Sequence, residues 1–362
     1  MTQCSRRAFL ATLAASAPLL SGCNLWPKPA NPRAEVLGHL VRQIAVPDAR
    51  AIAGQARALA DALRAEQTQP SAASLDHARA ALSRSALAWQ NAYAFRNGPI
   101  IESHAYLRSA FWPTRPSALR DVIESQDTID TGLVAELGVD AKGVFAIEHL
   151  LYEGPATAAP TWYAGPQCER ARALAVALAD DAAAYAHKAQ QQLGAGELFS
   201  QQFGHAGQES INLLVNQMIA TLETAASRRV EHVLATHDNG TLRSKDVQGA
   251  LSGLSSAIPR AWLATTERIY AGTATAGEHG NAGLSTLVRS AAPQIDAHMR
   301  EVFGVAAHAL QALHAPLEQL ITQDRAPLVA AVSALKALET ACRVELASAL
   351  GVTLTFVASD GD

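Results

Sequence analysis

The sequence contains few aromatic and few charged residues, and both shortages narrow the choice of fold. Aromatic residues make up 5% of the 362 residues and charged residues 17%, whereas 49% are hydrophobic. Intrinsic disorder is excluded, because disordered chains are rich in charge and poor in apolar residues. Strands favour aromatic and β-branched side chains, while Ala and Leu favour helices. The abundance of Ala and Leu therefore predicts an all-α chain.

The chain also lacks an excess of positive charge and the short motifs of common enzymes. Its formal net charge is −4 and it has no long basic run, so binding to nucleic acid through phosphate neutralisation is not expected. It contains no H-E-x-x-H pair, no G-x-S-x-G elbow, no Walker loop and no C-x-x-C pair. The sequence therefore carries no familiar signature of a zincin, a serine hydrolase, a nucleotide-binding enzyme or a dithiol oxidoreductase.

The N-terminus has the layout of a bacterial export signal. Arg6 and Arg7 give it a positive start, and residues 8–20 are apolar but too few for a permanent membrane span. The run SRRAFL at positions 5–10 resembles a twin-arginine signal. We predict a signal peptide at residues 1–22, used by the twin-arginine or the general secretory route.

A lipobox-like run, LSGC, ends this segment at Cys23, whose thiol would accept the lipid and anchor the mature chain to a membrane. Asn24 follows, and by resemblance to Gram-negative lipoproteins it favours the outer membrane over the inner one. Residues 23–33 are rich in proline and are predicted to be a tether. The alternative is an ordinary signal peptide with an incidental cysteine. We predict a periplasm-facing lipoprotein.

Two of the four cysteines remain in the body of the mature protein. Cys4 is removed with the signal and Cys23 is acylated, which leaves Cys168 and Cys342. In an oxidising periplasm these two thiols could pair, or they could both be buried and free. Their separation in sequence does not decide between the two.

Apolar residues recur with the helical period through almost all of the remaining chain. Gly194 and Gly196 interrupt this pattern about halfway. We predict two antiparallel helical bundles, at residues 34–195 and 196–362, packed together. One predicted helix in the second half runs from 244 to 271 with a kink at Pro259. Two apolar stripes in the first half consist of Leu37, Leu40, Val41 and Ile44, and of Ile52, Ala56, Leu59 and Leu63.

One strongly apolar segment, Gly143–Tyr152, carries a carboxylate in its middle. On a helix Glu148 shares a face with Phe145 and Tyr152. Burying a bare carboxylate is costly, so Glu148 must find a partner, reach solvent or become protonated. It is either a helix-edge group satisfied by solvent or by an arginine, or a group that lines a cleft between helices.

Four stretches of the sequence match the motifs of one family in the family's order. They are WQNAYAFRNGPI at 89–100, FWP at 111–113, GVFAIEHLLYEG at 143–154 and LGVTLTFVASDGD at 350–362. Together they resemble the W…F-R-x-G-P, W-P, G-x-H-x-x-E and L-G-V…F…D-G-D segments of the imelysin-like family, whose members are often described as peptidases. The resemblance covers most of the mature chain. It implies two helical bundles with a cleft between them.

The chain departs from the family at the motif on which the peptidase description depends. Phe145 stands in place of the motif histidine, and His149 stands where an aromatic residue is common. Phe cannot ligate a metal, and His149 is rotated by about 100° from Glu148 on a helix, so these two do not chelate one ion. A hydrolytic zinc site usually needs three protein ligands. We expect no peptidase activity through this motif.

The resemblance also implies a link to iron, because family members include iron-regulated lipoproteins and periplasmic components of iron uptake. On this reading the chain is a binding protein that holds iron, or another divalent metal, with oxygen ligands from both bundles. Glu148 would be one ligand. Asp246 would be another, because SKDV at 244–247 loosely fits the family's S-x-x-D segment. The alternative for Asp246 is a stabilising role in the first turn of a helix.

Arg96 and His104 are the remaining candidates for contact with a ligand, together with Glu102. Arg96 could instead pair with Glu148 and replace a metal site by a structural ion pair. The protein would then be an interaction scaffold that grips a peptide or another envelope protein without a metal. Trp89 and Trp112 are interpreted as core or cleft-wall residues. We rank an iron-uptake-associated binding protein first, a scaffold second and a metallopeptidase third.

Overall fold

The computed structural model describes residues 31–96, 98, 100, 104–152, 166–194, 197–240, 242–243, 246–278 and 282–355. Within these ranges all regular structure is helical, so the predicted all-α class is confirmed and no described segment forms a strand. The predicted signal peptide, Cys23 and nearly all of the tether lie outside the described residues. None of the helices in the described ranges is both long and apolar enough to span a bilayer.

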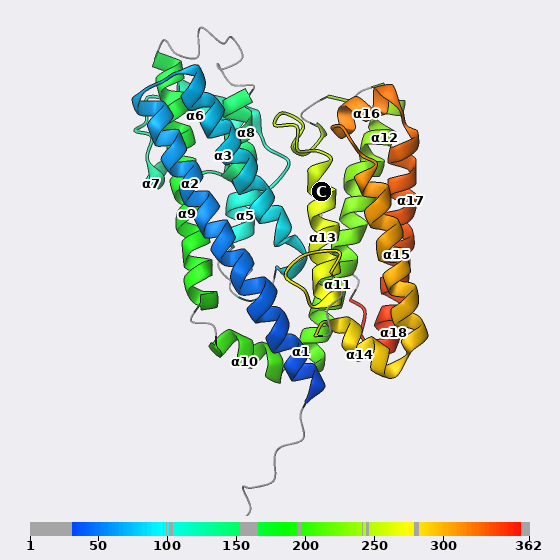
Figure 1. Cartoon of the computed structure of the whole chain (residues 1–362). Coiled ribbons are helices and arrows are strands. Elements are labelled where there is room, and N and C mark those ends of the chain that lie inside the picture. The colour runs from blue at the N-terminus through cyan, green and yellow to red at the C-terminus, as the bar shows by residue number, and fades with distance from the viewer. Residues whose placement is uncertain are drawn as a thin grey trace, which may run out of the picture. The chain divides into compact units, whose positions relative to one another are not determined.

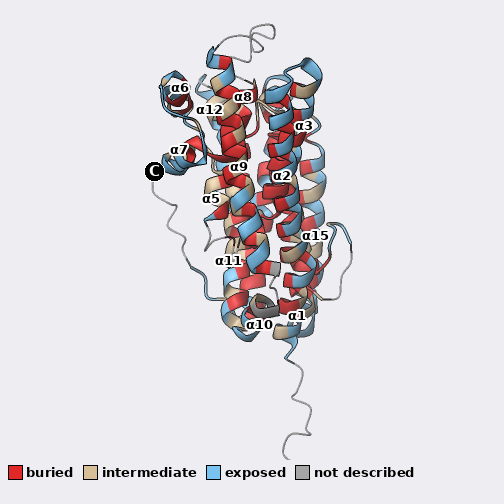
Figure 2. Ribbon diagram, turned by 90° about the vertical axis from the view of Figure 1, so that its left-hand side faces the viewer, coloured by how far each residue is buried: buried red, intermediate tan, exposed pale blue. Residues whose placement is uncertain are grey.

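The first half of the chain packs around two long helices, α2 and α9, with α3 and α8 beside them (Figure 1). Both predicted apolar stripes are buried, and Figure 2 shows buried residues running along α2, α3 and α9. The helices of this half are α1 (Pro32–Leu40), η1 (Val41–Ala45), α2 (Val46–Thr68), α3 (Ala72–Asn91), η2 (Tyr93–Phe95), α5 (Ala105–Ala110), α6 (Pro116–Glu124), α7 (Thr131–Glu136), η3 (Val139–Ala141), α8 (Gly143–Tyr152) and α9 (Pro166–Gly194).

In the second half, α15 and α17 pack along each other and against α11, α13 and η5. The helices are α10 (Glu197–His205), α11 (Gln208–Glu223), η5 (Thr224–Glu231), α12 (His232–Asp238), α13 (Ala257–Ala271), α14 (Leu284–Ala291), α15 (Pro293–Gln311), α16 (Leu317–Gln323), α17 (Ala326–Ala341), η7 (Cys342–Leu346) and α18 (Ala347–Leu350). Within the described residues, η5 and η7 of this half and η1 of the first half are π-helical turns.

The predicted helix over 244–271 is wrong in its first half. Residues 246–256 form a series of turns, and α13 begins only at Ala257, with Pro259 in its first turn and not at a kink. The turns contain Gly249 and Gly253, which adopt φ of +75° and +71°. This left-handed backbone is open to glycine and interrupts a right-handed helix.

The two halves contact each other through α3 and η2 on one side and α11 and α13 on the other. The Nε1–H of Trp262 on α13 donates a hydrogen bond to Oε1 of Gln90 on α3 at 2.8 Å. The ring of Tyr93 stacks on Trp262 with 4.4 Å between centroids. Aromatic stacking and a buried hydrogen bond thus join the halves. Among the helices of the second half, α13 lies on the side nearest the first half (Figure 1).

Cys168 and Cys342 are both buried, and neither forms a disulfide. Of the two alternatives for these residues, the structure therefore has separate thiols and no bond between them. Burial raises the pKa of the Cys342 thiol, so it stays protonated and behaves as a small apolar core residue.

Candidate functional site

The helix that carries the candidate carboxylate begins at a glycine that no other residue could replace without movement. Gly143 has φ of +75°, and a Cβ at this position would clash with the carbonyl group of Ser109 at the end of α5. The start of α8 therefore lies directly against α5. Most residues of α8, including Glu148, are buried.

Glu148 is 5% exposed and is held by a residue of the second half of the chain. Its Oε1 accepts a hydrogen bond from the backbone N–H of Ser252 at 2.9 Å and a second from the Ser252 hydroxyl. Ser252 belongs to the turns at 246–256. The carboxylate thus lies where α8 meets the segment that leads into α13, and charge-assisted hydrogen bonds satisfy it there.

The residues that flank Glu148 do not add a metal ligand. Phe145, which occupies the motif histidine position, is 2% exposed and is part of the hydrophobic core. His149 is partly exposed, whereas Glu148 is buried, so the two side chains leave the helix in different directions. The contrast in burial agrees with the helical geometry that separates successive residues by about 100°.

Asp246 lies in the same 246–256 segment as Ser252 but has its own partner. Its Oδ2 accepts hydrogen bonds from the backbone N–H of Arg243 at 3.1 Å and from the Arg243 Nε at 3.0 Å. A role in the first turn of a long helix is excluded, because α13 begins eleven residues later at Ala257. Ser244 and Lys245, which carry the rest of the family-like match, lie outside the described residues.

Arg96 lies over two aromatic rings. Its guanidinium carbon is 3.7 Å from the ring centroid of Tyr93 and 4.7 Å from that of Tyr106, and its Nε donates to the Tyr93 carbonyl at 3.1 Å. These are cation–π distances. His104 is exposed, with φ of +54°, one residue before α5. Glu102 lies outside the described residues.

A second arginine, Arg229 on η5, was not predicted as a site residue. Its guanidinium carbon lies 4.6 Å from the ring centroid of Trp112 and 5.5 Å from that of Trp262. Its Nε donates to Oε1 of Gln248 at 2.6 Å. Trp112, for which the sequence leaves a core or a cleft-wall position open, is partly exposed and forms one wall of this arginine site. The sequence does not predict this site, because a π-helical turn has the same composition as an α-helical one.

A hollow of about 450 Å³ opens beside Arg229. A smaller hollow adjoins it and includes Arg229 itself, and the two share Trp112, Arg228, His232 and Asp246. The larger hollow is lined by Trp112, Pro113, Ser227, Arg228, His232 and Asp246. Of the predicted site residues, Asp246 is the one that borders this space.

Residues 45–342 match the sequence profile of the imelysin family, also named peptidase family M75. The chain belongs to the imelysin family. A comparison with curated proteins finds no match. The resemblance stated from four sequence stretches is thereby confirmed over most of the chain.

Two solved structures share the imelysin-family fold with this chain. An imelysin-like protein from Psychrobacter arcticum 273-4 has a TM-score of 0.70 at 18% identity, covering 90% of this chain and 98% of that one. A protein from Parabacteroides distasonis ATCC 8503, provisionally named an iron-regulated protein A precursor, has a TM-score of 0.71 at 14% identity, covering 90% and 96%. At these identities the likeness concerns the fold.

The donors that the structure describes around Glu148 in this imelysin-family member do not fit a resident catalytic zinc. In the part of the chain that the structure describes, no three His, Cys, Asp or Glu side chains are grouped so that they could hold a metal ion. Glu148 is engaged by Ser252, and a phenylalanine occupies the motif histidine position. Three protein ligands and an open position are the usual requirement for hydrolytic zinc.

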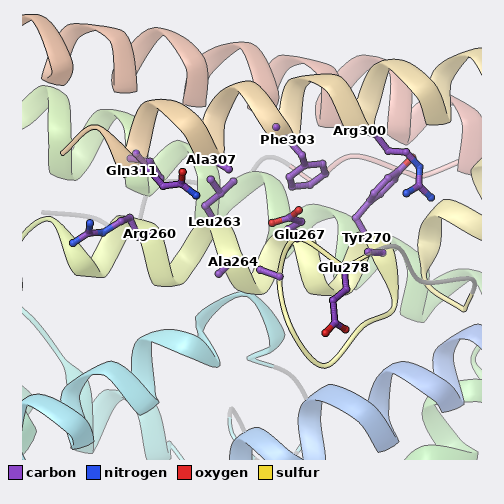
Figure 3. Close-up of a pocket in the computed structure, with 15 residues that line it drawn as sticks. Arg260, Leu263, Ala264, Glu267, Tyr270, Glu278, Arg300, Phe303, Ala307 and Gln311 are labelled. Atoms are coloured by element: carbon purple, nitrogen blue, oxygen red, sulfur yellow. The ribbon is translucent and has the colours of Figure 1, made fainter. Parts of the chain in front are cut away.

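A further cavity, of about 460 Å³, lies between α13 and α15 under the loop that follows α13 (Figure 3). Arg260 and Gln311 lie at one end, and Arg300, Tyr270 and Glu278 at the other. The Tyr270 hydroxyl donates to Oδ1 of Asp296 at 2.7 Å, and Arg300 donates to Oδ2 of the same residue at 3.1 Å. Charges of both signs border this cavity, and at its Tyr270 end Arg300 is held by the ion pair with Asp296.

Proposed function

We propose that this imelysin-family protein is a lipid-anchored, periplasm-facing binding protein associated with iron uptake and that it is not a peptidase. Its helices are proposed to form two antiparallel bundles with the binding cleft between them. The observation that carries the proposal is the position of Glu148, buried where α8 meets the 246–256 segment and paired with Ser252. A binding site can form at such a junction between helices. Metal-dependent hydrolysis needs a set of metal ligands, and the motif lacks its histidine because Phe145 stands there.

The proposed association with iron is supported by other members of the family and by the name of one protein of the same fold. Imelysin-like proteins include iron-regulated lipoproteins, and the Parabacteroides protein of the same fold is provisionally named for iron regulation. Iron is here the cargo of the protein and not a catalytic cofactor. Glu148 and Asp246 remain the proposed oxygen donors, because both belong to or contact the 246–256 segment.

The test is calorimetric titration of ferric iron into the full processed protein and into Glu148→Ala. We expect the affinity for iron to fall at least tenfold in the variant. A matched control is Glu318→Ala. Glu318, on α16, also accepts a hydrogen bond from a serine, because the Ser255 hydroxyl donates to it at 2.7 Å. An affinity for iron that is the same in wild type and Glu148→Ala would remove Glu148 from the ligand set.

Peptidase activity is tested separately by incubating the protein with zinc and an unfolded protein substrate. We expect no metal-dependent cleavage, because Phe145 cannot act as a ligand. Cleavage that disappears on chelation of zinc would contradict the proposal.

A second candidate function, an interaction scaffold without metal, is favoured by the partners that the candidate residues already have. Glu148 accepts from Ser252, and Arg96 contacts the rings of Tyr93 and Tyr106. On this hypothesis, Phe145→His creates no affinity for zinc, although the variant folds, and a partner is recovered by affinity capture from envelope extracts. Zinc affinity gained by Phe145→His would count against it.

A further inference from the structure

A π-helical turn, η5, presents two consecutive arginines beside the hollow that Trp112 lines. Arg228 is exposed and borders the hollow, while Arg229 is partly buried and borders the smaller hollow next to it. In a regular helix consecutive side chains point about 100° apart, so they rarely line the same hollow. Short π-helical segments are rare and frequently occur at functional sites.

No carboxylate of the described residues neutralises either guanidinium, because no Asp or Glu oxygen among them lies within ion-pair distance of Arg228 or Arg229. The polar contacts of Arg229 are both neutral: Nε donates to Gln248 Oε1 at 2.6 Å and Nη1 donates to the Arg228 carbonyl at 3.0 Å. Its other contacts are the rings of Trp112 and Trp262. Burial lowers the pKa of Arg229, yet a guanidinium remains charged near neutral pH.

The hollow has a positive balance even when its one carboxylate is included. Asp246 borders it, but Arg243 donates to this carboxylate at 3.0 Å and offsets its charge. Of the other described groups, Arg228 and His232 border this hollow, and Arg229 borders the smaller hollow next to it. A partly buried, uncompensated guanidinium is unfavourable without an anion. The larger hollow, at about 450 Å³, has the size of a small-molecule site.

We propose that this hollow binds a small polycarboxylate anion, either free or as its ferric complex. The guanidinium groups of Arg228 and Arg229 donate to its carboxylates, and the ring of Trp112 forms the wall of the site. Carried in this form, iron would keep carboxylate ligands of the anion besides the proposed donors Glu148 and Asp246, and the arginines would recognise the charge of the complex. For the ferric complex this inference rests on the proposed function, whereas for the free anion it does not.

The test is calorimetric titration of citrate and of ferric citrate into the full processed protein. Arg228→Gln is the decisive variant, because the side chain is exposed and its loss leaves the core intact. We expect its affinity for both probes to fall about tenfold or more, since a charge-assisted contact is lost. Arg229→Lys keeps the positive charge but loses the paired N–H donors of the guanidinium. It is expected to bind both probes more weakly than wild type. Arg84→Gln, an exposed arginine on α3, is the control and should bind as wild type does.

Several outcomes separate this inference from the proposed function. Equal affinity of wild type and Arg228→Gln for both probes would overturn the inference, as would binding of inorganic phosphate without binding of citrate. Iron binding that depends on Glu148 but not on Arg228 would overturn it and leave the proposed function standing. Binding of free citrate alone, weakened in Arg228→Gln, would support the anion site and overturn its assignment to the ferric complex.

Discussion

At the scale of single residues, Glu148 is one of the points at which the two halves of the chain contact each other. Its Oε1 receives two hydrogen bonds from Ser252, and the site is 5% exposed. Removing an acceptor from buried donors leaves those donors unsatisfied. This contact is therefore structural as well as a candidate for ligand binding, and the two roles respond differently to substitution.

Glu148→Ala is predicted to lower the free energy of unfolding by about 1–3 kcal/mol, because the donors of Ser252 lose their acceptor. Glu148→Gln keeps an oxygen at the same place and is predicted to lose less. Urea unfolding monitored by circular dichroism measures both. A glutamine variant as unstable as the alanine variant would show that the charge, and not the acceptor, holds this junction.

The residue types at the site were only partly predictable from the sequence. Glu148 could be singled out because a carboxylate in an apolar helix is unusual, and Phe145 because it departs from the motif. Ser252 could not, because the apolar periodicity predicts a helix over a stretch in which the structure has turns. Arg229 could not either, since its importance comes from Trp112 and Trp262, which are far from it in sequence.

At the scale of elements, the periodicity of apolar residues predicts regular helices correctly and fails where the backbone is irregular. The stripe of Ile52, Ala56 and Leu59 identified α2 correctly because a buried face repeats every 3.6 residues. The left-handed glycines at 249 and 253 broke the helix predicted over 244–271. Packing between elements depends on side chains from distant segments, and no local pattern shows it.

The start of α8 gives a prediction with a matched control. Gly143→Ala is predicted to destabilise the protein by about 1–3 kcal/mol from backbone strain alone, and the clash with Ser109 adds to this cost. Gly54→Ala in α2 is predicted to stabilise by about 0.5–1 kcal/mol, because its Cβ meets no atom and alanine favours helix. Thermal unfolding of both variants checks the difference. A tolerated Gly143→Ala would contradict the close approach of α8 to α5.

The packing of α2 on α9 includes a buried ion pair between Glu66 and Arg172, with 3.3 Å between Oε1 and Nε and exposed side-chain fractions of 1% and 4%. Glu66→Ala is predicted to cost about 3–5 kcal/mol, because it removes the carboxylate from a buried guanidinium. The double variant Glu66→Leu with Arg172→Leu is predicted to lose less than this single variant. Urea unfolding compares the two, and a double variant that is less stable than Glu66→Ala would refute the explanation.

At the scale of the whole molecule, the predicted location depends on Cys23 and can be tested apart from the fold. Cys23→Ala is predicted to release the protein from the membrane fraction, because the acyl acceptor is lost. Fractionation of the envelope followed by immunoblotting measures the change. Ser21→Ala is a control that keeps a small residue before the cysteine. Retention of Cys23→Ala in the membrane fraction would contradict the lipid anchor.

The central claim is that this imelysin-family protein binds iron-bearing cargo and does not hydrolyse peptides. The most direct measurement is elemental analysis of the protein purified from an iron-replete envelope. The account predicts iron at close to one equivalent per chain, with less in Glu148→Ala and in Arg228→Gln, and no stoichiometric zinc. Protein that carries zinc in place of iron, or no metal from an iron-replete envelope, would contradict it.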